Sequence, residues 1–327
     1  MKKLALYLSL LAVIVLLFIA SLRIGIIHLQ TPLWDLIGKH DGIDATTVWD
    51  VRFPRVFGAA LLGAALGVAG VIAQGIFRNP LAEPTLIGLT SGATLGSIAV
   101  IATGAAAFGS RTNVESAVLF AGLAALLVQL LAPNKGLGFL ITGIAISAIL
   151  TALAGVMISI SAKPGVQSLS FWNFGSLAML NNQTLKIIAP FIELGFISAF
   201  MVSRKLDIYS LGENSSHYMG VKPKQIRLWA IISLALLIGP AVSAVGAIAF
   251  LGLLVPHIVR LLVGSSHRRA LSFSALIGAI ILMLADLASR TLFQPHEIPL
   301  GLLTSLIGAP ALIILLRLRS AQWVSHD

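Results

Sequence analysis

The chain has 327 residues, of which 57% are hydrophobic and only 10% charged, and its mean hydropathy is +0.98. Soluble domains are typically about a quarter charged and disordered chains have low hydrophobicity, so both classes are excluded and a polytopic membrane protein remains. The net charge of +10 does not indicate nucleic-acid binding, because the basic residues are scattered between apolar runs and form no basic stripe.

Apolar runs follow one another along the chain and predict an all-α polytopic protein with ten membrane-spanning helices in a single permease domain, residues 1–327. The first run is 19 residues long, longer than a signal-peptide core, so we interpret it as an uncleaved span. The longest run, Leu228–Val259, has 32 residues and is split into two spans because Gly239-Pro240 and Gly246 interrupt it. The predicted spans are Leu4–Leu22, Val56–Phe77, Leu86–Ala107, Ser116–Ala132, Leu137–Ala162, Ile187–Val202, the two parts of Leu228–Val259, Leu271–Leu292 and Ile298–Leu316.

The distribution of Lys and Arg predicts the orientation, because cytoplasmic loops carry an excess of both. With the N-terminus inside, the cytoplasmic side holds 14 of the 22 basic residues and the outer side holds 8. Both termini are therefore expected to be cytoplasmic, in a cytoplasmic (inner) membrane. The outer basic residues are Arg23, Lys39, Arg52, Arg55, Arg111, Lys163, Lys186 and Arg290.

Two hydrophilic segments between the spans stand out, together with one amphipathic segment. The outer segment Ile24–Val51 carries acids and tryptophans. The inner segment 203–227 is the longest on the cytoplasmic side, and Gly212 and Gly220 predict one or two short helices there, with a proline before the next span. The outer segment Lys163–Lys186 predicts an amphipathic helix on the membrane surface.

The chain carries no motif for nucleotide binding or catalysis. The patterns G-x-x-x-x-G-K-[ST], H-E-x-x-H and G-x-S-x-G are absent, and with no cysteine there is no thiolate metal site. We therefore expect no enzymatic activity, no metal and no cofactor in this chain. Any ATP and Mg²⁺ that energise transport are expected on a partner ATPase.

Few ionisable residues lie inside the predicted spans, and they offer an alternative function. An intramembrane charge is a functional-site hypothesis by default, here ion-coupled secondary transport through Asp286 or Glu193. In the structural alternative, both carboxylates face the bundle interior, paired or protonated. Asp286 precedes Arg290 by four residues, the spacing of a pair within one helix. His257 is interpreted as a packing or helix-end residue.

Three glycines lie at spacings of four and three residues on the second predicted span. Gly63, Gly67 and Gly70 share one helical face, which predicts a close contact with a neighbouring helix.

Three arginines lie at the outer ends of predicted spans. Arg52 and Arg55 directly precede the second span, and Arg290 lies near the outer end of the ninth. Cations on this side run against the orientation rule, and guanidinium groups pair well with the carboxylates of an acidic partner. Contact with lipid phosphate or with Asp50 is the alternative, and charge placement leaves both open.

Four stretches carry a specific signature, namely RFPRVFGAALLGAALGVAGVIAQGIFRNPLAEPTLIGLTSGATLG (52–96), LGENSSHYMGV (211–221), GAIAFLGLLVPHIVRLLVGSSHRRALSFSALIGAIILMLADLASRTL (246–292) and EIPLGLLTSLIGAP (297–310). In order and spacing they resemble the FecCD-like permeases, the membrane subunits of type II ABC importers for iron chelates and vitamin B12. The resemblance covers most of the chain.

The resemblance implies a homodimer with the translocation path between the copies. It also implies two ATPase subunits on the cytoplasmic coupling loop 203–227 and a substrate-binding protein that docks outside through acidic residues. By this resemblance the binding-protein docking residues are Arg52, Arg55 and Arg290, the ATPase-coupling residues are Leu211, Gly212, Glu213, Gly220 and Val221, and the cytoplasmic gate is Asn79, Pro80 and Leu81. The segment His257–Arg260 leads into an inner loop, Ser265–Arg269, that could add ATPase contacts.

The cargo is the least specific part of the resemblance. The segment SLSFWNFGSLAML (168–180) is more similar to the ferric-chelate and haem members than to the cobalamin members. We therefore expect a ferric siderophore or haem, with vitamin B12 as the alternative cargo.

Overall fold

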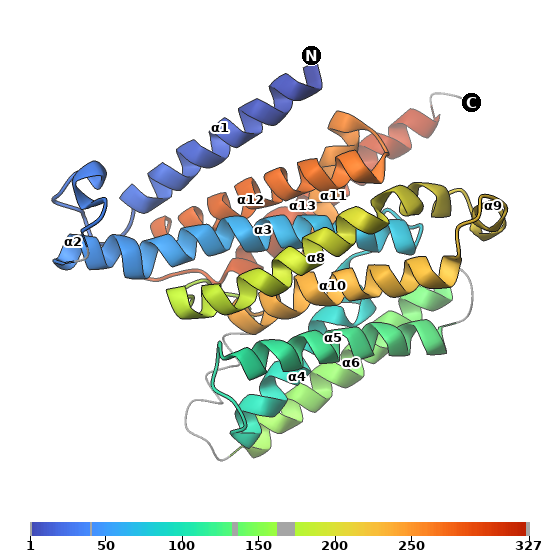
Figure 1. Cartoon of the computed structure of the whole chain (residues 1–327), viewed down its shortest axis with the longest axis horizontal. Helices are drawn as coiled ribbons and strands as arrows, with labels where there is room; N and C mark the ends of the chain where they lie inside the picture. Colours follow the sequence, from blue (N-terminus) through green and yellow to red (C-terminus); the bar gives the residue numbers. More distant parts are fainter. Residues whose placement is uncertain (1, 40, 133–136, 162–173, 325–327) are drawn as a thin grey trace.

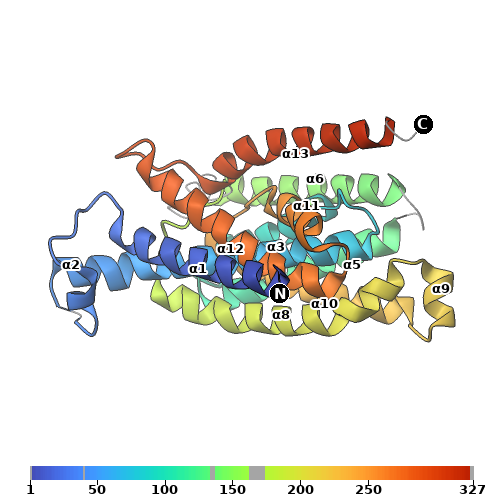
Figure 2. The same ribbon diagram turned by 90° about the horizontal axis from the view of Figure 1, so that it is seen from above.

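The computed structural model describes residues 2–39, 41–132, 137–161 and 174–324. Over these ranges the chain contains helices and no strands, and the longer helices form one bundle (Figures 1 and 2). Two short helices mark opposite ends of the bundle: α2 (Ile43–Thr46) lies at what we name the α2 end, and α9 (Glu213–Tyr218) at the α9 end (Figure 1).

Among the described residues, seven helices are long and apolar enough to cross a membrane, and three more are apolar but shorter. Each predicted span overlaps one of these helices, whereas the ten-span count and the side of the termini stay predictions. The helices are α1 (Lys2–Arg23), α3 (Phe53–Ile76), α4 (Leu89–Thr103), α5 (Arg111–Leu131), α6 (Leu137–Ile160), α8 (Asn182–Tyr209), α10 (Pro223–Val245), α11 (Leu251–Val263), α12 (His267–Thr291) and α13 (Leu300–Val324).

The long apolar run 228–259 is divided into two helices as predicted, but at only one of the two predicted points. The break lies between α10 and α11, where Gly246 and Phe250 both have positive φ, 79° and 66°. Gly239-Pro240 lies inside α10 instead. A proline is tolerated within a membrane helix when neighbouring helices surround it, and Pro240 is buried.

Segment 203–227 is more helical than predicted, and the described part of segment 163–186 is less helical than predicted. In segment 203–227, α8 continues to Tyr209, α9 follows, and Pro223 begins α10, so little of it is loop. The predicted amphipathic helix is wrong for residues 174–181, which are not helical, while 162–173 lie outside the described residues. Segment 24–51 contains the short helices η1 (Leu33–Leu36), α2 and most of η2 (Thr47–Arg52).

Helix α3 is the central helix, and its three glycines make the close contacts that their spacing predicts. A Cβ added to Gly63 would lie 2.3 Å from the carbonyl oxygen of Gly278 in α12, and one added to Gly67 would lie 2.4 Å from that of Ser274. A Cβ added to Gly70 would lie 1.9 Å from the carbonyl oxygen of Gly252 in α11. The backbones of α3, α11 and α12 therefore touch without intervening side chains.

Replacing Gly70 with alanine is expected to destabilise the fold, because the methyl group would force two backbones apart. Overpacking of this kind costs about 1–3 kcal/mol. Thermal unfolding of the purified protein in detergent measures the loss. Gly155→Ala is the matched control, since the added Cβ at that exposed position in α6 meets nothing within 4 Å. Equal melting temperatures for the two variants would contradict the close contact.

Candidate functional site

The three arginines predicted to dock a partner lie together at the α2 end, but they are buried. Only 4% of Arg52, 7% of Arg55 and 4% of Arg290 is exposed. The sequence places them correctly at the ends of helices α3 and α12. It does not reveal that their guanidinium groups turn inward and find partners within the chain.

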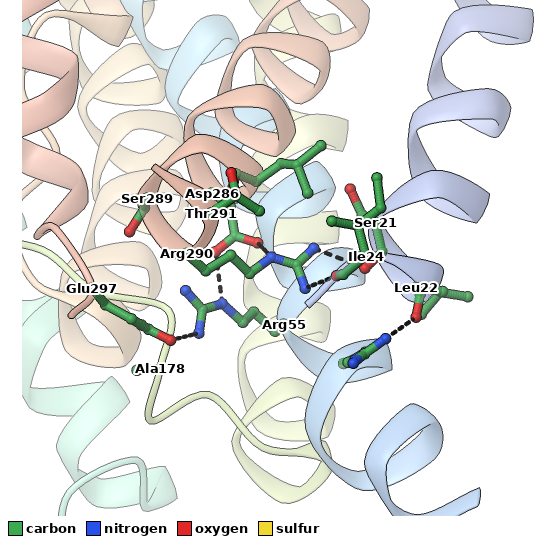
Figure 3. Close-up of polar contacts among 12 residues, drawn as sticks. Ser21, Leu22, Ile24, Arg55, Ala178, Asp286, Ser289, Arg290, Thr291 and Glu297 are labelled. Carbon is green, nitrogen blue, oxygen red and sulfur yellow. Dashed lines mark hydrogen bonds and ion pairs between the residues drawn. The ribbon is translucent and has the colours of Figure 1, made fainter. Parts of the chain in front are cut away.

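Arg55 lies at the centre of this cluster (Figure 3). Its Nε donates to Asp286 Oδ1 at 2.7 Å, and its Nη1 donates to Glu297 Oε1 at 2.8 Å. Asp286 is only 1% exposed, whereas the Glu297 side chain is 31% exposed. The first turn of α3 is thereby joined to the last turns of α12 and to the turn that precedes α13.

Arg290 extends the cluster towards α1. Its Nε lies 3.4 Å from Asp286 Oδ2, which confirms the predicted pair within one helix. Its two terminal nitrogens donate to the carbonyl oxygens of Ser21 (2.8 Å) and Ile24 (3.0 Å), as Figure 3 shows. One guanidinium therefore joins the buried carboxylate of α12 to the end of α1.

Arg52 binds the same end of α1. Its Nη1 donates to the carbonyl oxygens of Leu22 (2.8 Å) and Arg23 (2.9 Å), and its Nη2 donates to that of Ile27. The last carbonyls of a helix have no partner within the helix, so two arginines from other helices supply the missing donors. Asp50 instead accepts from Asn182 Nδ2 at 3.5 Å.

The two intramembrane carboxylates differ in position. Both oxygens of Asp286 face guanidinium groups, in agreement with the expectation of a paired interior carboxylate. Glu193 is exposed on the surface of α8, so the expectation that it faces the bundle interior is wrong. The apolar run around Glu193 has no strong periodicity that would indicate which side of the helix is buried.

A buried carboxylate that the sequence analysis missed links the segment between α3 and α4 to the segment between α10 and α11. Glu83 lies between α3 and α4, is 5% exposed, and accepts a hydrogen bond from the backbone N–H of Phe250 at 2.5 Å. Phe250 is the residue before α11, so the carboxylate also faces the positive end of that helix. A search for charges within apolar runs overlooks Glu83 because it lies between two runs.

Burial raises the pKa of the Glu83 carboxyl above its ordinary value, opposed by hydrogen bonds from Phe250 and Thr85. An acid with a raised native pKa stabilises the fold most at low pH and less as the pH rises above its unfolded value of about 4.5. Glu83→Gln mimics the protonated form and does not titrate. The stability of the wild type is therefore expected to fall relative to that of Glu83→Gln as the pH rises. Glu83→Ala leaves the Phe250 N–H unpaired and is expected to cost about 1–3 kcal/mol at any pH. Thermal unfolding between pH 5 and 8 tests both; a pH-independent difference between Gln variant and wild type would contradict the pKa direction.

The predicted gate residues form the turn directly after α3. The side chain of Asn79 accepts from the backbone N–H of Leu81 at 2.9 Å, and its carbonyl oxygen accepts from Ala82 at 3.1 Å. Pro80 and Leu81 are exposed. The turn is held by local bonds and presents its tip at the α9 end.

The predicted ATPase-coupling residues surround α9, which projects from the α9 end (Figures 1 and 2). Gly212 precedes α9 with φ 116° and Gly220 follows it with φ 74°, conformations that favour glycine. Leu211 is 65% exposed and Tyr218 91%, so the segment presents apolar side chains to the surroundings. Val221 is partly buried and packs on the core, while the side chain of Glu213 lies outside the described residues.

A hydrogen-bonded side-chain pair links the helix before α9 to α12. Asp207, near the end of α8, accepts from the backbone N–H of His267 at 2.8 Å and lies 2.7 Å from its Nδ1. His267 is 3% exposed and lies against α3, since a Cβ at Gly75 would approach its Nε2 to 2.6 Å. His257, in α11, is buried as a packing residue would be.

These features define a helical protein in which several helices are long and apolar enough to span a membrane, with a buried arginine–carboxylate cluster at one end and the projecting α9 at the other. The sequence matches the FecCD transport family over residues 11–318. It is 37% identical to the hemin transport system permease protein HmuU of Yersinia pestis over 96% of each chain. It is 36% identical to the ferric enterobactin transport system permease protein FepD of Escherichia coli, covering 86% of this chain and 84% of that one. The chain belongs to the FecCD transport family.

Solved structures agree with this assignment. A metal-chelate type ABC transporter in an inward-facing conformation matches with a TM-score of 0.84 and 32% identity, over 96% of this chain and 99% of that one. The structure of PsaBC from Streptococcus pneumoniae in complex with Fab shares the fold, with a TM-score of 0.65 and 16% identity over 87% of this chain and 95% of that one.

Proposed function

We propose that this chain is the permease subunit of an ABC importer that moves an iron chelate, a ferric siderophore or haem, across the cytoplasmic membrane. The observation that carries the proposal is the similarity, over almost the whole chain, to permeases named for hemin and ferric enterobactin transport. The chain lacks a nucleotide-binding motif, which agrees with energy supplied by a separate ATPase.

In this proposal the single domain 1–327 spans the membrane ten times with both termini in the cytoplasm. The α9 end is then cytoplasmic, as the excess of basic residues on that side supports. Two copies pair to enclose the path, and ATP-driven movement of the paired ATPases reorients the helices to give alternating access.

The two ends of the bundle have different proposed partners. The ATPase contacts Leu211, Gly212, Glu213, Gly220 and Val221, and the exposed apolar side chains around α9 support such a contact. A binding protein that engages Arg52, Arg55 and Arg290 has to exchange their internal partners for its own carboxylates, because all three are buried.

Reconstitution tests this proposal. The permease is placed in liposomes with an ATPase and a binding protein from neighbouring genes, and uptake is followed for a ferric siderophore, haem and cobalamin in turn. ATP-dependent uptake of an iron chelate supports the proposal. Uptake of cobalamin but of no iron chelate would show that the cargo is vitamin B12 instead. Uptake driven by a proton gradient without an ATPase would contradict the proposed mechanism and favour ion-coupled transport through Asp286 or Glu193.

A further inference from the structure

A cavity of about 130 Å³ lies between the last turns of α8 and the first turns of α10, next to α9. Two lysines, Lys205 and Lys222, line it together with the amide side chain of Gln225. Its remaining wall includes Met201 and Trp229. The cavity is therefore lined by two cations and one amide, and Met201 and Trp229 give it an apolar wall.

The surface of α8 changes from apolar to basic at this cavity. Leu194, Ile197 and Met201 lie on one face of the helix and are 55%, 56% and 67% exposed. One turn further along the same face, Lys205 lines the cavity. Exposed apolar side chains on a membrane helix meet acyl chains, and a lysine at the end of such a stripe reaches the headgroup layer.

The first turns of α10 show the same gradient. Trp229 is 47% exposed, Gln225 lies one turn nearer the end, and Lys222 precedes the helix. Tryptophan is enriched at the boundary between acyl chains and headgroups. The two helices therefore place the cavity at that boundary, on the face that presents the stripe of α8.

The charge of the cavity fits an anion. The residues that line it include two lysines and no carboxylate. Asp207 does not line the cavity, and it contacts the backbone N–H and the Nδ1 of His267 instead. Basic pockets between membrane helices on the cytoplasmic side are where acidic lipid headgroups bind, and each lysine near that surface contributes about 1 kcal/mol.

We propose that this cavity binds the phosphate headgroup of an acidic phospholipid. Lys205 and Lys222 pair with the phosphate, Gln225 donates a hydrogen bond to it, and the acyl chains lie along the apolar stripe of α8 and against Trp229. The proposal does not depend on the cargo. Gly220 and Val221, two of the proposed ATPase-coupling residues, also line the cavity, so binding is measured on the permease without an ATPase.

Native mass spectrometry of the full-length protein in detergent, titrated with phosphatidylglycerol, measures this binding. The double variant Lys205→Ala/Lys222→Ala is expected to bind about 25-fold more weakly, about fivefold for each lysine. Arg204→Ala/Lys224→Ala is the matched control, because it removes two exposed charges from the same region that do not line the cavity. The control is expected to bind within about twofold of the wild type, since its charges are farther from the phosphate.

Two further arms identify the ligand. Phosphatidylcholine, in which the choline ammonium group balances the charge of the phosphate, is expected to bind more weakly than phosphatidylglycerol, and the difference is expected to vanish in Lys205→Ala/Lys222→Ala. Phosphatidylglycerol with brominated acyl chains is expected to quench a fluorescence component that Trp229→Phe lacks. Equal losses in both double variants would show attraction to the whole basic end and overturn the site. Full displacement of the lipid by inorganic phosphate would overturn the lipid as its ligand.

Discussion

Asp286→Asn is expected to lower the free energy of unfolding by about 3–5 kcal/mol, because it leaves two buried guanidinium groups without their shared counter-charge. The substitution keeps the size of the side chain and removes only the charge between Arg55 (2.7 Å) and Arg290 (3.4 Å). Chemical or thermal unfolding in detergent measures the loss.

The control for this prediction is another carboxylate that pairs with an arginine four residues away. Glu115 pairs with Arg111 at 2.8 Å, but the side chains are 48% and 78% exposed. Exposed pairs of this kind contribute about 0.3–0.5 kcal/mol, so Glu115→Gln is expected to change stability very little. If Asp286→Asn kept full stability and abolished only transport, Asp286 would be an ion-coupling residue rather than a structural one.

Glu213→Ala is expected to weaken ATPase association by about 30-fold or more if Glu213 is a charged contact of the proposed interface, because truncating one partner of such a pair costs at least about 2 kcal/mol. Glu213 is the first residue of α9, between the exposed Leu211 and Tyr218. Co-purification and substrate-stimulated ATP hydrolysis in liposomes measure the effect. Thermal stability is expected to stay unchanged.

Asp35→Ala provides the comparison, since it removes an exposed carboxylate of η1, which packs on α2 through Leu36 and Ala45, at the opposite end of the bundle from α9. It is expected to leave ATPase association unchanged. Equal loss in both variants would indicate a general electrostatic effect, and no loss in either would remove Glu213 from the coupling contact.

Features that depend on neighbouring residues in one helix could be predicted from the sequence. The apolar runs locate the helices, the spacing of Gly63, Gly67 and Gly70 predicts a close packing face, and the four-residue interval predicts the Asp286–Arg290 pair. Each of these depends on helical geometry alone.

Features that depend on how helices rotate against each other could not be predicted. Arg55 and Asp286 are 231 residues apart in the chain, and their pairing requires that α3 and α12 lie side by side in one register. Glu83 finds its partner 167 residues away, at a helix break. The burial of the three arginines and the exposure of Glu193 likewise follow from helix rotation, which apolar runs without strong periodicity leave open.

The contacts along α12 give it the geometry of a lever. Its close contact with α3 at Gly278 lies near the middle of its 25 residues, while His267 binds Asp207 at one end and Arg290 binds α1 at the other. Each arm is about 18 Å long, so a tilt of about 10° around the contact displaces the two ends by about 3 Å in opposite directions. If α12 tilts as a rigid rod about this contact, a movement at the His267 end is accompanied by an opposite movement at the buried arginines.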